Sequence, residues 1–300
     1  MFIPDYEPSM INNYGRWQSV DLHVHSIYSG ASLTPLEILN SAGAAFLDAV
    51  AISDHNEVRG AIEGQIITGS TVGLPVVLSS QEVSAGEHCH FLLVGSTRAQ
   101  ADVNRSKLPE VLQKHRETGG VVILAHPWTT FKNNWFRGLC RELIAGSLLD
   151  GMELCNASVL ELPRSVVALV RKLWEEWVIP NRLAVVGGSD YHYRNKERKI
   201  GLGRTYLKVY EPGEKGLLDA LRNRRCVAGL FGGPEIDFPG VMVGGNFYLG
   251  QEPWWGELQD LINVLRYRVA QRERFDSRAI CFLLQLIAAG HFQAVADLLV

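Results

Sequence analysis

The sequence predicts an α/β fold built from repeated strand–helix units. Through the first two-thirds of the chain, short apolar runs alternate with segments of helical hydrophobic spacing, which is the pattern of βα units. Histidines and carboxylates follow directly after several of these apolar runs. In a parallel barrel the carboxyl ends of the strands carry the functional loops. A barrel with a site at that edge therefore accounts for both observations.

The apolar runs and the helical segments can be placed along the chain. Strands are expected at 20–25, 49–53, 76–79, 91–94, 121–125, 151–154, 184–187 and 205–209. Helices are expected at about 35–45, 57–68, 105–118, 134–146, 163–177 and 213–224. The first helix has the clearest start, because Thr34 can cap it, Pro35 suits its first position and Glu37 completes a capping box.

Size and composition fit one barrel-sized domain, or one domain with an appendage. The chain has 300 residues and is 47% hydrophobic, which is enough for a large core. A formal net charge of −3 gives no overall attraction to nucleic acid or to an anionic membrane. A local basic patch is compatible with that charge.

The cysteines and the N-terminus indicate a soluble cytoplasmic protein. The cysteines form no C-x-x-C pair and are odd in number, which favours reduced thiols; they are Cys89, Cys140, Cys155, Cys226 and Cys281. The first ten residues carry Asp5 and Glu7, where a signal peptide carries basic residues. The apolar stretches are too short or too interrupted to cross a membrane, which takes about 20 residues.

The segment D-L-H-V-H-S, residues 21–26, is the first candidate metal site. Side chains alternate faces along a strand, so His23 and His25 point the same way, about 7 Å apart at Cβ. Two such imidazoles can bind one ion of Zn, Mn or Fe. Asp21 shares their face and could orient a ring nitrogen. Because H-x-H also occurs by chance on polar strand faces, other segments must support the site.

Two carboxylates follow the next apolar runs. A-I-S-D-H-N places Asp54 and His55 at a strand end, where the pair suits metal ligation or acid–base catalysis. The alternative for Asp54 is a cap on the next helix. Glu82, in Q-E-V-S, is the candidate bridging ligand, because a carboxylate can bridge two cations and a neutral imidazole cannot.

The segment H-C-H-F-L-L-V-G offers two histidines around one cysteine. His90 leads directly into a strand, whereas His88 belongs to the preceding turn, so His90 is the preferred ligand. Cys89 is expected to be a small buried residue, because the other candidates are nitrogen and oxygen donors.

Two later strands also end in candidate ligands. His126 follows a very apolar run in A-H-P, and Asp190 and His192 lie in G-G-S-D-Y-H. The glycines before Asp190 allow a close backbone approach. His115 and His291 lack such a setting; we expect a solvated helix position for the first and a helix terminus for the second.

Beyond residue 230 the pattern changes. Residues 229–256 are rich in Gly and Pro and predict an irregular connection. Residues 257–274 and 277–299 predict two amphipathic helices, with a break at Gly290. We therefore divide the chain into a barrel with the candidate metal site, 1–230, and an extension of unknown role, 231–300, for which a helical cap or an oligomer interface is favoured over a second catalytic unit. The sequence leaves the oligomeric state open.

These motifs, in this order, closely resemble the PHP family, the polymerase and histidinol phosphatase metallohydrolases. The resemblance covers roughly residues 18–230, and it extends beyond the motifs above to I-G-L-G-R-T-Y-L and L-L-D-A-L-R-N-R-R-C. It implies a distorted (β/α)7 TIM-like barrel with up to three divalent ions, Mn, Fe or Zn, at the carboxyl ends of the strands.

The resemblance also implies the ligands. One ion would be held by His23, His25, Glu82 and Asp190. Glu82 would bridge to a second ion held by His90 and His126, and His55 and His192 would hold a third. Many relatives add a ligand for the third ion shortly after H-x-H, but this chain has Gly30 and Ala31 there. The third ion is then weak, absent or completed by water or another residue, and a two-metal centre is an alternative.

The expected activity is hydrolysis of a phosphomonoester or small phosphodiester, such as a nucleotide, a sugar phosphate or a short oligonucleotide. Clustered cations activate a hydroxide and hold phosphate oxygens. The candidate catalytic residues are His55, His192 and Glu82, and either histidine could protonate the leaving group. Basic residues on the loops after His126 and His192 could bind phosphate, or they are solvated loop charges; they are Lys132, Arg137, Arg194, Lys196 and Arg198.

Two other functions stay open. The same hydroxide can attack the carbonyl of a carbamate, an ester or an amide. A non-catalytic metal-binding module is the third reading, with the altered third site marking lost activity.

Overall fold

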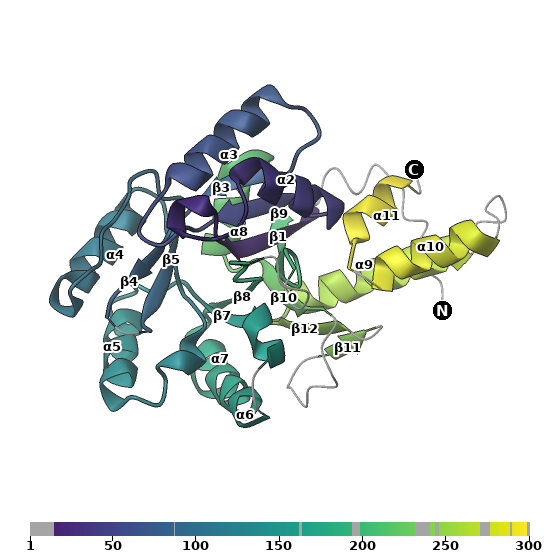
Figure 1. Cartoon of the computed structure of the whole chain (residues 1–300). Helices are drawn as coiled ribbons and strands as arrows, with labels where there is room; N and C mark the ends of the chain where they lie inside the picture. The colour runs from purple at the N-terminus through teal and green to yellow at the C-terminus, as the bar shows by residue number, and fades with distance from the viewer. Residues whose placement is uncertain are drawn as a thin grey trace.

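The computed structural model describes residues 15–86, 88–161, 164–193, 199–231, 241–243, 246–270, 277–288 and 290–298. Within them the chain has a mixed α/β fold with two sheets (Figure 1). The larger sheet has the order β11 (Val241–Val243), β12 (Asn246–Gly250), β10 (Cys226–Leu230), β9 (Gly203–Val209), β1 (Arg16–Val24), β2 (Ala49–Ile52) and β3 (Val76–Ser79). The smaller sheet has the order β4 (Glu82–Ser84), β5 (His90–Val94), β6 (Val121–Leu124), β7 (Gly151–Asn156) and β8 (Ala184–Gly188).

Strand directions are mixed. β1, β2 and β3 run parallel, as do β6, β7 and β8. β5 is antiparallel to both β4 and β6, and β9 is antiparallel to β1 and β10. The β4–β5 pair has an evident cause: only a short turn connects these strands, and parallel strands need a crossover of a dozen or more residues. The expected succession of βα units is therefore interrupted at β4 and β5.

The two sheets meet along two seams at their carboxyl-edge loops. At one seam the His25 amide donates to the Tyr191 carbonyl at 3.0 Å, just beyond β1 and β8. At the other, the Glu82 amide donates to the Asp54 carbonyl at 3.1 Å, just beyond β2. Isolated bridges rather than full ladders join the sheets there, Val24 with Tyr191 and His55 with Glu82. The described strands thus form two sheets that close toward each other, and no single closed barrel.

An apolar core fills the space between the sheets. It contains alternate residues of both sheets, including Leu22 from β1, Ala51 from β2, Leu92 from β5 and Ile123 from β6, all fully buried. Strand side chains alternate faces, so the residues one position along point the other way, toward the covering helices. This packed interior supports the strand ends that carry the polar residues.

Helices cover the outer faces of the sheets (Figure 1). They are α2 (Pro35–Ala44), α3 (Arg59–Ser70), α4 (Leu108–Glu117), α5 (Asn134–Ala145), α6 (Arg164–Leu173), α7 (Ile179–Asn181) and α8 (Gly213–Arg222). Each predicted helix and each predicted strand is present, most of them with shifted ends, and the strand at 76–79 has the predicted bounds. The capping box of α2 is confirmed: the Thr34 hydroxyl accepts from the Glu37 amide, and the Glu37 carboxylate accepts from the Thr34 amide at 2.9 Å.

The C-terminal residues continue the larger sheet and then pack on it. The expectation of an irregular connection is wrong at β11 and β12, which pair with each other and with β10. Helices α9 (Trp254–Ala270), α10 (Ser277–Ala288) and α11 (Phe292–Leu298) follow, and Gly290, with φ +78°, makes the predicted break. The Tyr206 hydroxyl of β9 donates to the Gly290 carbonyl at 2.8 Å, which fixes that break on the sheet. The division at residue 230 stays a prediction.

No helix in the described part of the chain combines the length and the apolar character that a membrane crossing requires.

Candidate metal centre

Six histidines and two carboxylates from different strands meet at the edge where the two sheets close. Two of these residues adopt a left-handed backbone conformation, His126 with φ 25° and Asp190 with φ 50°. Non-glycine residues rarely adopt positive φ, and such strain concentrates at functional sites. The fold brings together His23, His25, His55, Glu82, His90, His126, Asp190 and His192.

Glu82 lies at the centre of this group and its side chain is 1% exposed. One carboxylate oxygen, Oε1, lies 2.9 Å from Nδ1 of His90 and 2.9 Å from Nε2 of His126. The other, Oε2, faces three histidines. Its distances are 3.3 Å to Nε2 of His23, 3.2 Å to Nε2 of His25 and 3.0 Å to Nδ1 of His55. One carboxylate therefore faces two sets of imidazoles, the geometry expected of a bridging ligand.

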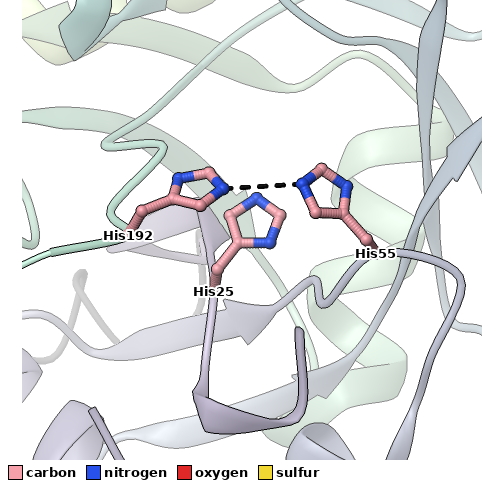
Figure 2. A group of neighbouring side chains, drawn as sticks. All are labelled: His25, His55 and His192. Carbon is pink, nitrogen blue, oxygen red and sulfur yellow. Dashed lines mark hydrogen bonds between the residues drawn. The ribbon is translucent and has the colours of Figure 1, made fainter. Parts of the chain in front are cut away.

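In the described part of the chain, three sets of side chains have ligand atoms close enough to share an ion. They are His23, His25 and Asp190; His23, Glu82 and His126; and His25, His55 and His192. Figure 2 shows the last set, with the three rings turned toward a common centre. Nε2 of His192 lies 3.5 Å from Nε2 of His55. The first two sets share His23, and the first and third share His25. Because one imidazole nitrogen has one lone pair, His23 and His25 can each serve one ion only, so the three sets cannot all be complete at once.

The donor atoms suit a divalent metal. Nε2 of His23 and Nε2 of His25 lie 3.0 Å apart in the buried centre. A neutral imidazole has one N–H and one bare nitrogen, so this contact needs a shared proton or a cation between the rings. Nitrogen and carboxylate donors bind Zn, Mn and Fe. The residues present therefore fit the metal centre that the sequence predicts.

Electrostatics in the centre also favour a cation. Burial lowers the pKa of His25 to about 3, which keeps its ring neutral. For His23 burial also lowers the pKa, but the carboxylates of Glu153, Glu82 and Asp190 outweigh it and hold the pKa well above the usual value. Positive charge is thus stabilised at His23, whether a proton or a metal ion supplies it.

Glu153 was missed by the sequence prediction. It lies in β7, fully buried, and both of its carboxylate oxygens are 3.1 Å from Nδ1 of His23. Its Oε2 also accepts the His126 amide at 3.0 Å. The sequence does contain a signal for Glu153, which is the lone carboxylate within the apolar run 151–154. A buried charge needs partners, so a carboxylate in such a run indicates a polar contact inside the fold.

Asp21 has a different task from the one expected. Its carboxylate accepts backbone amides, from Ser189 at 2.9 Å and from Gly201 at 2.8 Å, and it contacts no ring nitrogen in the described residues. Burial raises the pKa of Asp21 to about 6. It holds the loops on either side of Asp190, while Glu153 is the residue that orients His23.

Gly188 makes the approach of these strands possible. A Cβ at this position would lie 2.5 Å from Cβ of His23 and 2.8 Å from Oε1 of Glu153. Such distances are far inside van der Waals contact, so the expected close backbone approach before Asp190 is present, and only glycine allows it.

The remaining histidines lie outside the group. His88 is exposed at φ 56°, so the fold places His90, and not its neighbour, at the centre. His115 is not solvated as expected: it is 9% exposed, and its Nε2 lies 3.1 Å from the Val94 carbonyl. His291 lies just before α11, as expected for a helix terminus. Cys89 is buried, and burial raises the pKa of its thiol to about 12.

The structure describes two of the basic residues that were candidates for phosphate binding. Lys132 is exposed. Nη1 of Arg137 donates to the carbonyl of Phe131 at 2.8 Å and to that of Lys132 at 3.3 Å. That guanidinium stabilises its own loop, which favours an ordinary loop charge over a phosphate-binding residue at this position. Arg194, Lys196 and Arg198 lie outside the described residues.

Comparison with known proteins defines the class of fold. No family model matches the chain. It resembles the crystal structure of a two-domain protein of Bacteroides vulgatus that contains a predicted PHP-like metal-dependent phosphoesterase, with a TM-score of 0.56 and 17% identity over 72% of this chain. The chain spans 65% of the length of that structure. At this identity the likeness establishes the fold alone, and the fold is PHP-like.

One sequence relative defines the family more narrowly. The chain belongs to the same family as MJ1587, an uncharacterized protein of Methanocaldococcus jannaschii, with 30% identity over 153 residues, which are 46% of this chain and 81% of that protein. An amidohydrolase of Chromobacterium violaceum shows a weaker structural likeness, with a TM-score of 0.47 and 16% identity over 68% of this chain and 96% of that one. That score is too low to carry an argument about chemistry.

Proposed function

We propose that the protein is a metal-dependent phosphoesterase that hydrolyses a phosphomonoester or a small phosphodiester. The observation that carries the proposal is the position of Glu82, whose two oxygens face separate sets of histidines. A carboxylate between two sets of ligands is suited to hold two cations a few ångströms apart, the arrangement that phosphoester hydrolysis uses. We propose that the ions are Mn, Fe or Zn, and that the two sheets with their seams are a distorted form of the (β/α)7 barrel of the PHP family.

When bound, divalent ions lower the pKa of water and stabilise charge on phosphate oxygens. The chain's own residues supply the rest. Glu82, almost fully buried, holds the two sets of ligands in one place. His55 and His192 are the most open members of the group, with side chains 35% and 28% exposed. A substrate entering from solvent reaches them first, and either ring can donate a proton to a departing alkoxide.

The third ion is the variable part of the proposal. The set His25, His55 and His192 contains no carboxylate, and Gly30 and Ala31 stand where relatives place a further ligand. When that set holds no ion, His55 and His192 are free for acid–base work. A centre with two ions thus supports the same reaction.

The substrate is a small phosphoester, with a nucleotide, a sugar phosphate and a short oligonucleotide as the leading classes. A cytoplasmic location is part of the proposal, supported by Cys89, Cys140, Cys155 and Cys226, which are free thiols buried in the fold.

A phosphoester panel tests the function. Protein loaded separately with Mn, Fe or Zn is assayed on aryl phosphomonoesters and phosphodiesters, nucleotides, sugar phosphates and short oligonucleotides, with aryl esters and carbamates alongside. We expect phosphate release that His25→Ala reduces at least about 100-fold. Faster turnover of the carbonyl substrates would favour the alternative hydrolase, and inactivity on every substrate with metal bound would favour a binding module.

A further inference from the structure

The Asp54 carboxylate lies buried beside the metal centre without being a candidate ligand in any of the three sets. It does not cap α3, whose N-cap is Val58. Instead it accepts three short hydrogen bonds, each 2.6 Å long, from the Ser26 amide, the Ser26 hydroxyl and the Ser29 hydroxyl. A buried carboxylate costs free energy unless such partners satisfy it, so this arrangement is a built feature of the fold.

The backbone of α3 lies close against the Asp54 carboxylate. A Cβ at Gly60 would lie 2.2 Å from Oδ2 of Asp54 and 2.6 Å from Oγ of Ser26. Helix α3 therefore packs directly against the carboxylate. The Ser26 hydroxyl is also committed, because it accepts the Tyr28 amide at 3.2 Å while donating to Asp54.

The same hydrogen bonds determine which ring nitrogen of His25 carries the proton. A serine hydroxyl has one proton, and the proton of Ser29 goes to Asp54, its closest acceptor at 2.6 Å. Oγ of Ser29 also lies 3.3 Å from Nδ1 of His25. Because its proton is already given to Asp54, this oxygen can only accept from His25. Nδ1 of His25 must then carry the N–H, and Nε2 keeps its lone pair.

That Nε2 is the atom that faces the other ligands, 3.2 Å from Oε2 of Glu82 and 3.7 Å from Oδ1 of Asp190. We propose that Asp54 and Ser29 form a positioning relay that fixes the tautomer and ring orientation of His25 for metal binding. It is the counterpart of the direct contact between Glu153 and His23. The relay rests on the proposed metal centre and adds Ser29 and Asp54 to the residues that determine its affinity.

Metal affinity tests the relay without any substrate. Wild-type protein, Ser29→Ala, Ser29→Thr and Asp54→Asn are titrated with Co²⁺ or Zn²⁺ against a competing chelator, and the Co²⁺ absorption spectrum is recorded. Partners of this kind contribute about 10- to 100-fold in affinity. We expect Ser29→Ala to weaken binding by about 10-fold and to alter the Co²⁺ spectrum, Asp54→Asn to act in the same direction, and Ser29→Thr to restore binding because it keeps the hydroxyl.

The matched control is Ser32→Ala, on the same loop, because the Ser32 hydroxyl is buried and has no hydrogen-bond partner among the described residues. This variant should bind metal like wild type. The melting temperature of each metal-free variant reports folding separately. Wild-type affinity in Ser29→Ala, or weak binding in Ser29→Thr equal to that of Ser29→Ala, would overturn the relay. Wild-type protein that binds no divalent metal would overturn the relay and the metal centre together. Tight metal binding without phosphoester hydrolysis would overturn the proposed function alone.

Discussion

The carboxylate of Glu153 and the imidazole of His23 form a buried pair in which both oxygens lie 3.1 Å from Nδ1. This contact places the N–H of His23 on Nδ1 and turns Nε2 toward Glu82 and Asp190. Carboxylates in this position orient metal-binding histidines and raise their basicity. The contact joins β7 of the smaller sheet to β1 of the larger sheet. His23 is therefore oriented for metal binding by the packing of the two sheets against each other.

Replacing Glu153 with Gln should weaken metal binding by about 10- to 100-fold. The amide keeps the size of the side chain but loses its charge, so Nε2 of His23 becomes a weaker ligand for a metal ion. Competition with a chelator measures the change, and Glu117→Gln, on the exposed end of α4, is the control for removing one negative charge. Equal affinity in Glu153→Gln and wild type would show that this carboxylate only fills space.

Metal should leave the centre in two phases. The set His25, His55 and His192 has no carboxylate and is the more open one, whereas the set His23, Glu82 and His126 is buried around Glu82. A chelator should therefore strip the first set before the second. His192→Ala should remove the early phase and leave the late one, as followed by metal analysis of timed samples. A single phase, or complete loss of metal in His192→Ala, would contradict this division.

Gly188→Ala should destabilise the protein by about 1–3 kcal/mol, because the added methyl group would overpack against His23 and Glu153. Gly69→Ala, in α3, is the matched control, because apart from the adjoining helix backbone no described atom lies within 4 Å of an added Cβ. Alanine there should stabilise the fold by about 0.4–1 kcal/mol. Denaturant unfolding of the metal-free proteins measures both. The prediction fails when Gly188→Ala unfolds at the wild-type denaturant concentration.

Acid should weaken the attachment of the C-terminal helices. Burial, with a further contribution from the Arg204 charge, lowers the pKa of His291 to about 4 from 6.5. Between these two pH values His291 is protonated in the unfolded chain and neutral in the folded chain. The free energy of unfolding therefore falls as the pH drops from about 6.5 to about 4, and this contribution changes no further below that pH. Wild type should lose a few degrees more in melting temperature over this range than His291→Gln. Identical pH profiles for the two metal-free proteins would rule out a role for His291.

Much of the candidate site follows from local sequence patterns. Strand ends are marked by the change from apolar to polar residues, and His90 was separated from His88 because only His90 enters a strand. The assignment of the histidines around Glu82 to separate ions could be made only through the family resemblance. The two sheets could not be foreseen from strand order, because strand direction depends on partners far along the chain.

The residues that sequence reasoning missed or misassigned act through long-range contacts. Glu153 lies 130 positions from His23 in the chain, and no local pattern links them. Asp54 was expected to ligate metal, act in acid–base catalysis or cap a helix, but its partners come from the turn after β1. His115 was expected to be solvated because its helix is polar, whereas its ring packs beneath β5 and β6 and contacts their carbonyls.

The most direct test of the metal centre is elemental analysis of metal per chain in wild type, His25→Ala and Asp190→Ala, with His88→Asn as the control outside the group. Asn tolerates the left-handed backbone that His88 adopts. The account predicts about two to three ions in wild type and in His88→Asn, and fewer in His25→Ala and Asp190→Ala, with all four proteins folded. Wild-type protein without stoichiometric metal, or unchanged metal content in His25→Ala, would contradict it.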